Sequence, residues 1–157
     1  MNEKPCCKPC CPPHCQNDQL AYALYFQPSV LSNDAPFDGV ALSEIGAESI
    51  GDFFSDGSTI QILKPGVYLV TYTIHLPAST AVDTTFALQA NRQNIPSTVR
   101  TVTKTATGST SSITAQAILE TNTPVALRLS SSSQITITGT ANETLASLAI
   151  TQLVSCS

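Results

Sequence analysis

The chain has 157 residues, of which only 11% are charged, and its formal net charge is -4 at pH 7. Ordinary domains have about 25% charged residues, and the few basic residues here form no cluster that could neutralise the phosphates of a nucleic acid. No apolar run reaches the roughly 20 residues of a membrane-spanning helix, and the N-terminus lacks the basic-then-apolar pattern of a signal peptide, so we expect no nucleic-acid partner, no membrane segment and no cleaved export signal.

Residues 1–18 differ in composition from the rest of the chain. The opening sequence MNEKPCCKPCCPPHC places five cysteines among four prolines. The cysteines are Cys6, Cys7, Cys10, Cys11 and Cys15. Because proline fixes φ and lacks an amide donor, this composition favours an extended, polyproline-like backbone. We therefore expect a Cys/Pro-rich connector arm over residues 1–18, followed by one folded domain over residues 19–157.

The odd number of cysteines in the arm means that its complete oxidation requires a sulfur from elsewhere. The chain offers one further cysteine, Cys156. Fifteen residues at about 3.1 Å each reach roughly 45 Å, whereas a compact body of about 140 residues has a diameter of roughly 37 Å. The two ends of one chain could therefore close on each other, or the arm could bond to another copy. We favour disulfides between copies.

A metal site is a rival interpretation of the arm. The CCxxCC spacing, followed by His14 and Cys15, offers thiolate and imidazole ligands of the kind that bind zinc or copper. The prolines at 9, 12 and 13 oppose the fold-back that such a site needs. The sequence thus favours disulfides over a metal site or an inert tail, and we expect no cofactor.

The folded domain opens with an apolar strand. The segment 19–27, QLAYALYFQ, carries apolar groups on both faces, as does the closing segment 144–154, TLASLAITQLV. This pattern is typical of strands that are buried on both faces. We expect both segments to be central strands that are packed on both sides.

An acidic stretch follows, without Lys or Arg between Lys8 and Lys64. Its acids are Asp34, Asp38, Glu44, Glu48, Asp52 and Asp56. Their spacing matches no EF-hand loop, so we interpret them as solvated loop residues, with a cation site as the alternative. Within the stretch, residues 41–54 give the only indication of a helix, which Gly46 and Gly51 weaken.

The remaining segments alternate apolar and polar residues, as half-buried strands do. The clearest is 66–76, in which one face carries Tyr68, Val70, Tyr72, Ile74 and Leu76. Similar alternation occurs in 85–91, 112–120, 124–130 and 134–138, and the segments 58–63 and 97–104 add further strands. The sequence therefore predicts an all-β fold, a two-sheet antiparallel jelly-roll sandwich of eight to nine strands with an extended N-terminal arm.

Motifs for catalysis are absent from the sequence. It contains no G-x-S-x-G, no H-E-x-x-H and no phosphate-binding glycine loop. His75 lies on the Thr-bearing face of its strand, where we expect a surface residue rather than a catalytic base. We predict that the protein is not an enzyme.

The run GSTIQILKPGVYLVTYTIHL, residues 57–76, joins an Ile-rich strand, a Pro-Gly turn and a G-x-Y strand. It resembles the jelly rolls of complement-type and tumour-necrosis-factor-like domains, and most of all those on bacterial spores: the head of the collagen-like exosporium glycoprotein and the exosporium basal-layer protein. The closing ASLAITQLV resembles their last strand, and the resemblance covers roughly residues 19–154. Unlike the collagen-like glycoprotein, this chain has no G-x-y repeat before the head.

In place of that repeat, the cysteine arm resembles the N-terminal connector of endospore appendage subunits. In that family the connector forms disulfides between subunits, a role that the resemblance gives to Cys6, Cys7, Cys10, Cys11 and Cys15, with Cys156 as a candidate acceptor. It implies a spore-surface protein that is made in the mother cell without a signal peptide, polymerises through its arm and contacts a spore-coat or exosporium anchor protein.

The leading expectation is thus a structural subunit of a spore-surface fibre, with intermolecular disulfides between its copies. The alternative is a trimeric complement-like or tumour-necrosis-factor-like head that binds a ligand or a surface. We expect no catalytic residues and no metal ligands under either reading.

Overall fold

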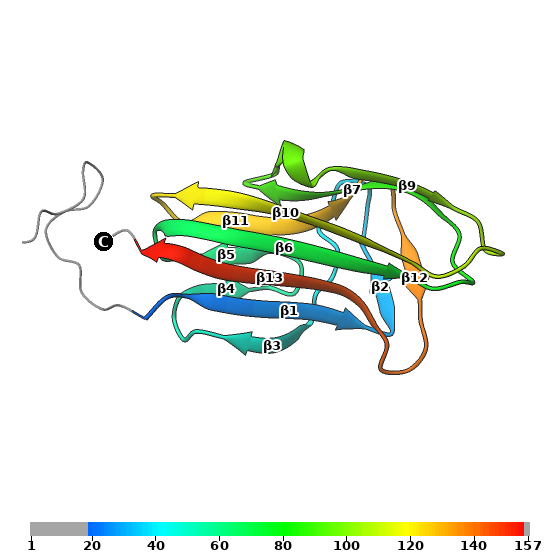
Figure 1. The fold of residues 1–157 in the computed structure, drawn as a ribbon, viewed down its shortest axis with the longest axis horizontal. Helices are drawn as coiled ribbons and strands as arrows, with labels where there is room; N and C mark the ends of the chain where they lie inside the picture. Colours follow the sequence, from blue (N-terminus) through cyan, green and yellow to red (C-terminus); the bar gives the residue numbers. More distant parts are fainter. Residues whose placement is uncertain (1–18, 156–157) are drawn as a thin grey trace, which may run out of the picture.

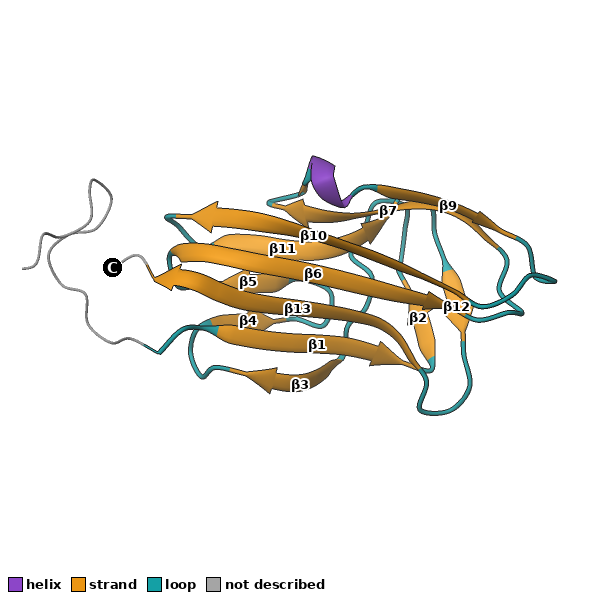
Figure 2. Ribbon diagram, viewed as in Figure 1, coloured by secondary structure: helices purple, strands orange, loops and turns teal. Residues whose placement is uncertain are grey.

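The computed structural model describes residues 19–155 of the chain. This range folds into two antiparallel sheets that pack face to face, and it contains no α-helix (Figures 1 and 2). The all-β jelly-roll sandwich expected from the sequence is confirmed. The expected arm over residues 1–18 and the last two residues, including Cys156, lie outside the described range.

The first sheet has five strands in the order β10-β6-β13-β1-β3. Its strands are β1 (Tyr22–Pro28), β3 (Glu44–Glu48), β6 (Gly66–Leu76), β10 (Ser111–Thr121) and β13 (Thr144–Ser155). The closing strand β13 lies in the middle, between β6 and β1, so its expected central place in the sheet is confirmed.

The second sheet follows the order β4-β5-β11-β7-β8, and β9 also pairs with β7. Its strands are β4 (Phe53–Ser55), β5 (Ile60–Ile62), β7 (Val82–Ala90), β8 (Gln93–Asn94), β9 (Arg100–Lys104) and β11 (Val125–Ser131). Two short strands, β2 (Val30–Ser32) and β12 (Thr136–Thr138), pair separately, and one 3₁₀ turn, η1 (Pro96–Thr98), precedes β9. Within residues 19–155, eight strands have five residues or more, in agreement with the number expected.

The core lies between the two sheets and follows the alternation read from the sequence. Every second residue of β6, from Gly66 to Leu76, is buried, and its tyrosines face residues such as Phe86 and Leu127 of the second sheet. The hydroxyl of Tyr72 donates to the carbonyl of Thr98 at 2.7 Å, so this buried polar group is satisfied. Full burial of a large apolar side chain stabilises a fold by about 1.5–3 kcal/mol.

The helix indicated over 41–54 is wrong. The segment forms the edge strand β3, a turn in which Gly51 has φ +81°, and then β4. Gly46 lies inside β3, where a Cβ would be 3.1 Å from Cδ2 of Leu24. Glycine costs about 1 kcal/mol in a helix, and here it permits close approach to β1.

The expectation that the first and last strands are packed on both sides is also wrong for the described chain. The second sheet covers only their inner face. On the other face Tyr22, Leu24 and Leu153 are 42%, 38% and 45% exposed. Residues 19–155 supply no third layer over these side chains.

Candidate functional site

The three adjacent strands β6, β13 and β1 at the centre of the first sheet contain no Asp, Glu, Lys or Arg. The register aligns Leu24 with Ala149, Ala149 with Thr71, and Thr71 with Gln116 of β10. We call their surface away from the core the outer face. Its residues are Tyr22, Leu24, Phe26, Val67, Leu69, Thr71, Thr73, His75, Ser147, Ala149, Thr151 and Leu153. This sheet lies in front of the other in Figure 2.

Apolar and small polar side chains make up the outer face. Beyond it, β10 presents Ile118, which is 69% exposed and pairs with Leu69. Toward the middle of the sheet, the hydroxyls of Thr73 and Thr114 lie 3.2 Å apart. A sheet face in water usually alternates with polar and charged residues, whereas loss of charge with retention of apolar groups is typical of the core of a protein interface.

The described chain enters and leaves the sandwich at one end, where β1 begins and β13 ends (Figure 1). The buried Gln152 joins three segments there. Its side chain accepts from the amide of Ala21 at 2.8 Å and donates to the carbonyl of Pro65 at 3.1 Å. A Cβ on Gly66 would be 2.6 Å from the carbonyl oxygen of Val154, so only glycine fits beside β13 at this point.

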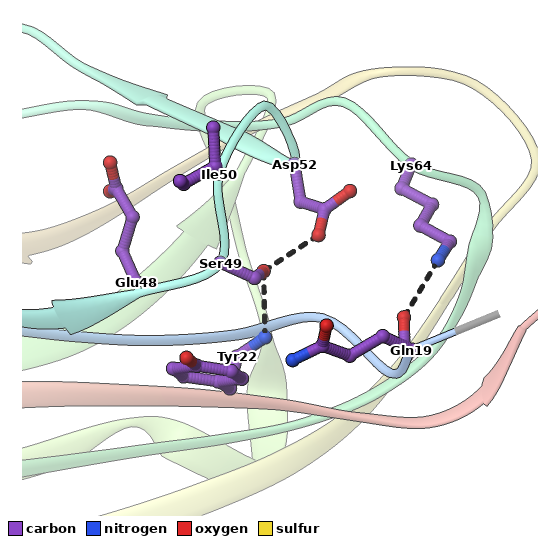
Figure 3. Close-up of a pocket in the computed structure, with 7 residues that line it drawn as sticks. All are labelled: Gln19, Tyr22, Glu48, Ser49, Ile50, Asp52 and Lys64. Carbon is purple, nitrogen blue, oxygen red and sulfur yellow. Dashed lines mark hydrogen bonds between the residues drawn. The ribbon is translucent and has the colours of Figure 1, made fainter.

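A shallow pocket of about 450 Å³ opens at the same end (Figure 3). It is lined by Gln19, Tyr22, Glu48, Ser49, Ile50, Asp52 and Lys64. Ser49 donates to Asp52 at 2.6 Å and accepts from the amide of Tyr22 at 3.1 Å, and the Lys64 ammonium donates to the carbonyl of Gln19 at 3.0 Å. These bonds hold the polar groups of the pocket in place.

Beneath the pocket, the Tyr25 hydroxyl donates to Oε2 of Glu48. Burial, together with the Glu48 carboxylate, raises the pKa of Tyr25 well above its ordinary value. The tyrosine therefore stays neutral and serves to hold the edge strand β3.

The acids of the stretch 34–56 are dispersed over strands and turns. Asp56 accepts hydrogen bonds from the amides of Ser58 at 2.9 Å and Thr59 at 2.7 Å, which lower its pKa. Within residues 19–155 no three His, Cys, Asp or Glu side chains gather closely enough to hold a metal ion. The alternative of a cation site in this stretch gains no support from the fold.

His75 has a partner that the sequence did not indicate. Its Nε2 lies 2.8 Å from Oε1 of Glu143, and the two side chains are 29% and 25% exposed. The amide of Thr140 and, to a smaller extent, His75 lower the pKa of Glu143. His75 is therefore half-buried and bonded to Glu143 at the end of the sandwich opposite the pocket, rather than a free surface residue.

All six cysteines, Cys6, Cys7, Cys10, Cys11, Cys15 and Cys156, lie outside the described residues. The structure shows where the segments that carry them join the sandwich. Cys15 precedes Gln19 by four positions, and Cys156 follows Ser155 directly. Gln19 accepts from Lys64 and Ser155 pairs with Gly66, so both belong to the same end of the sandwich. No helix in the described part of the chain has the length and apolarity of a membrane span.

No protein-family model matches the chain, and no curated protein matches it. Among solved structures, murine APRIL at pH 5.0 is similar with a TM-score of 0.61 and 8% identity, over 86% of this chain and 100% of that one. The globular domain of zebrafish complement 1qA has a TM-score of 0.54 and 10% identity over 87% and 97%. Pika GITRL has a TM-score of 0.53 and 16% identity over 88% and 98%.

These likenesses define the class of fold. The described chain is a jelly roll of the complement and tumour-necrosis-factor type. At such low identity the likeness extends to the fold alone, so the roles expected for the cysteines and the spore-surface origin stay predictions.

Proposed function

We propose that the protein is a non-enzymatic head domain that works as a homo-oligomer, with three copies packed through their outer faces, and that the assembled head binds a ligand or a surface. The observation that carries the proposal is the absence of charge from β6, β13 and β1, although one face of these strands is exposed. Three is the copy number implied by the resemblance to complement-like and tumour-necrosis-factor-like heads.

The outer face has the size and chemistry that an interface needs. The three strands of the outer face, about 4.8 Å apart with about ten residues of 3.4 Å each, present roughly 500 Å², and the neighbouring β10 raises this to roughly 650 Å². A stable interface buries about 600–1,000 Å² on each partner. Ser147 and Ala149 are small enough to allow close approach, and the three strands contribute no Asp, Glu, Lys or Arg whose removal from water would oppose association.

A pair of threonine variants tests the proposal. Thr73 lies on the outer face and Thr85 on the outward side of the second sheet; both are half-buried, and each hydroxyl lies beside a threonine of the next strand, at 3.2 and 2.8 Å. We expect native mass spectrometry in reductant to show three copies, or two such heads joined as six copies, for the wild type and Thr85→Arg, and fewer than three copies for Thr73→Arg. A wild type with single copies, or equal masses for the two variants, contradicts the proposal.

A spore-surface fibre subunit is the second candidate. It is favoured by the attachment of both cysteine-bearing segments at one end of the block, next to Gln19 and Ser155. Disulfides from Cys6, Cys7, Cys10, Cys11, Cys15 and Cys156 between copies would then make dissociation require reduction. Anchoring to a spore-coat or exosporium protein and location at the spore surface are proposals that rest on the sequence resemblance alone.

Negative-stain microscopy with and without reductant separates the two candidates. Long filaments support the fibre, whereas discrete particles support the head. If deletion of residues 2–15 leaves filaments equally robust, the arm has no part in holding them.

A further inference from the structure

We propose that the end of the sandwich where the chain enters and leaves is a second contact between copies, at which two heads meet end to end. We call this surface the terminal end; its apolar residues are Leu20, Ile50, Leu63, Leu153 and Val154. The inference rests on the proposed function for the number of copies in each head, and it adds an interface that the outer face does not provide.

Five exposed apolar side chains lie at the terminal end. The exposed fractions of Leu20, Leu63, Leu153 and Val154 lie between 43% and 48%, and Ile50 is 99% exposed. The register of β13 against β6 shifts between Gln152 and Val154, which marks a bulge. Because a bulge interrupts the alternation of faces, Leu153 and Val154 are both exposed.

The hydrogen bonds and strand pairing place these residues at one end of the sandwich. Leu20 precedes Ala21, which is bonded to Gln152, and Leu63 precedes Lys64, which binds Gln19. Ile50 lines the pocket together with Gln19 and Lys64 (Figure 3). Leu153 and Val154 follow Gln152 directly.

The opposite end of the molecule has a different composition. Its loops, residues 77–81, 105–110 and 139–143, read PASTA, TATGST and GTANE. They contain no Val, Ile, Leu, Met, Phe or Tyr. These three loops thus lack the large apolar side chains of the terminal end, and exposed apolar groups that gather in one region are typical of an interaction site.

Charge and chain connectivity point to a second copy as the partner. Lys64 lies in the same pocket as Glu48 and Asp52, so a two-fold contact would set the positive group of each copy opposite the acids of the other. The eighteen residues before Gln19 and the two after Ser155 are tethered to this end and carry all six cysteines of the chain. Of these cysteines, Cys156 follows Ser155 directly, so a bond between two Cys156 residues requires that two terminal ends adjoin.

The distance that a bond between two Cys156 residues can span distinguishes this arrangement from head-to-tail stacking. Adjacent Cα atoms are 3.8 Å apart and disulfide-bonded Cα atoms at most about 6.8 Å, so a bond between two Cys156 residues holds the two Ser155 Cα atoms within roughly 14 Å. In a head-to-tail stack, equivalent ends are separated by at least the length of β13, which is about 41 Å for its 12 residues at 3.4 Å each.

Sedimentation velocity of the full chain in reductant tests the contact. We expect the wild type to sediment as six copies, Val154→Asp as three, and Val30→Asp as six. Val30 is a matched control because it lies on β2, away from the terminal end, with an exposed fraction of 42% against 48% for Val154. Ile50→Asp changes a side chain that is almost fully exposed, so we expect it to sediment as three copies, like Val154→Asp, without any effect on folding.

The outcomes separate this inference from the proposed function. A wild type of three copies overturns the end contact and leaves the head intact, including the case in which the chain's own arm covers the terminal end. A wild type of two copies that Val154→Asp reduces to one supports the end contact and overturns the three-copy head. Single copies overturn both.

A disulfide trap provides an independent readout. In a full chain that carries Cys6→Ser, Cys7→Ser, Cys10→Ser, Cys11→Ser and Cys15→Ser, Cys156 is the one remaining thiol. Oxidised glutathione should join two Cys156 thiols: one disulfide forms, the glutathione disulfide is reduced, and two glutathione thiols are released with the two protons. We expect a two-chain product that Val154→Asp abolishes and Val30→Asp retains; if Val154→Asp retains it too, the bond does not depend on the terminal end and the inference is overturned.

Discussion

Asp56 organises the turn that joins β4 to β5. Its carboxylate accepts hydrogen bonds from the amides of Ser58 and Thr59. Because each such bond contributes about 0.5–1.5 kcal/mol net, we expect Asp56→Ala to lower the free energy of unfolding by about 1–2 kcal/mol in urea titrations at pH 7. The control Asp38→Ala removes an exposed loop carboxylate and should change it by less than about 0.5 kcal/mol.

The effect of Asp56 should disappear in acid. The pKa of its carboxyl is lowered in the folded chain, below the value of about 3.9 in the unfolded chain. The stabilisation is therefore fully present above about pH 4 and is lost as the pH falls through the lower, folded value. Wild type and Asp56→Ala should converge in stability at low pH, and a difference that stays constant down to pH 2 would contradict this assignment.

At the scale of the strands, Gly66 sets the approach of β6 to β13. A Cβ there would meet the carbonyl oxygen of Val154 at 2.6 Å, whereas a Cβ on the loop residue Gly108 would meet nothing closer than 3.4 Å. We expect Gly66→Ala to cost about 1–3 kcal/mol of stability and Gly108→Ala to be neutral or slightly stabilising. Thermal unfolding of the two variants measures the difference, and equal melting temperatures would refute the packing argument.

The sequence predicted those strands whose neighbours impose strict alternation. β6 begins and ends as expected because its inner residues face one continuous core. β3 was missed because an edge strand with exposed residues has little alternation, and the contact between Gly46 and Leu24 joins residues far apart in the chain. The contact of His75 with Glu143 was missed because these two residues also lie far apart in the chain.

The sequence correctly indicated apolar residues on both faces of the first and last strands. The expected cover over their outer face is not supplied by the described chain. A pattern without charge on either face indicates burial on both sides, whereas the described chain covers only one of them. A sequence does not distinguish cover by its own fold from cover by another copy. The outer face is thus the place where the pattern of one chain indicates an assembly.

For the whole molecule, the proposed association depends on the outer face. If copies pack through the outer face, Tyr22 and Leu24, which are 42% and 38% exposed in the single chain, become buried on association. Phe37, which is 59% exposed on the loop after β2, is the internal reference.

Hydroxyl-radical footprinting of the full chain in reductant measures this burial directly. If copies pack through the outer face, the oxidation of Tyr22 and Leu24 relative to that of Phe37 is severalfold lower in the wild type than in Thr73→Arg. Equal oxidation of Tyr22 and Leu24 in the two proteins, at concentrations well above those of the native mass measurement, would contradict it.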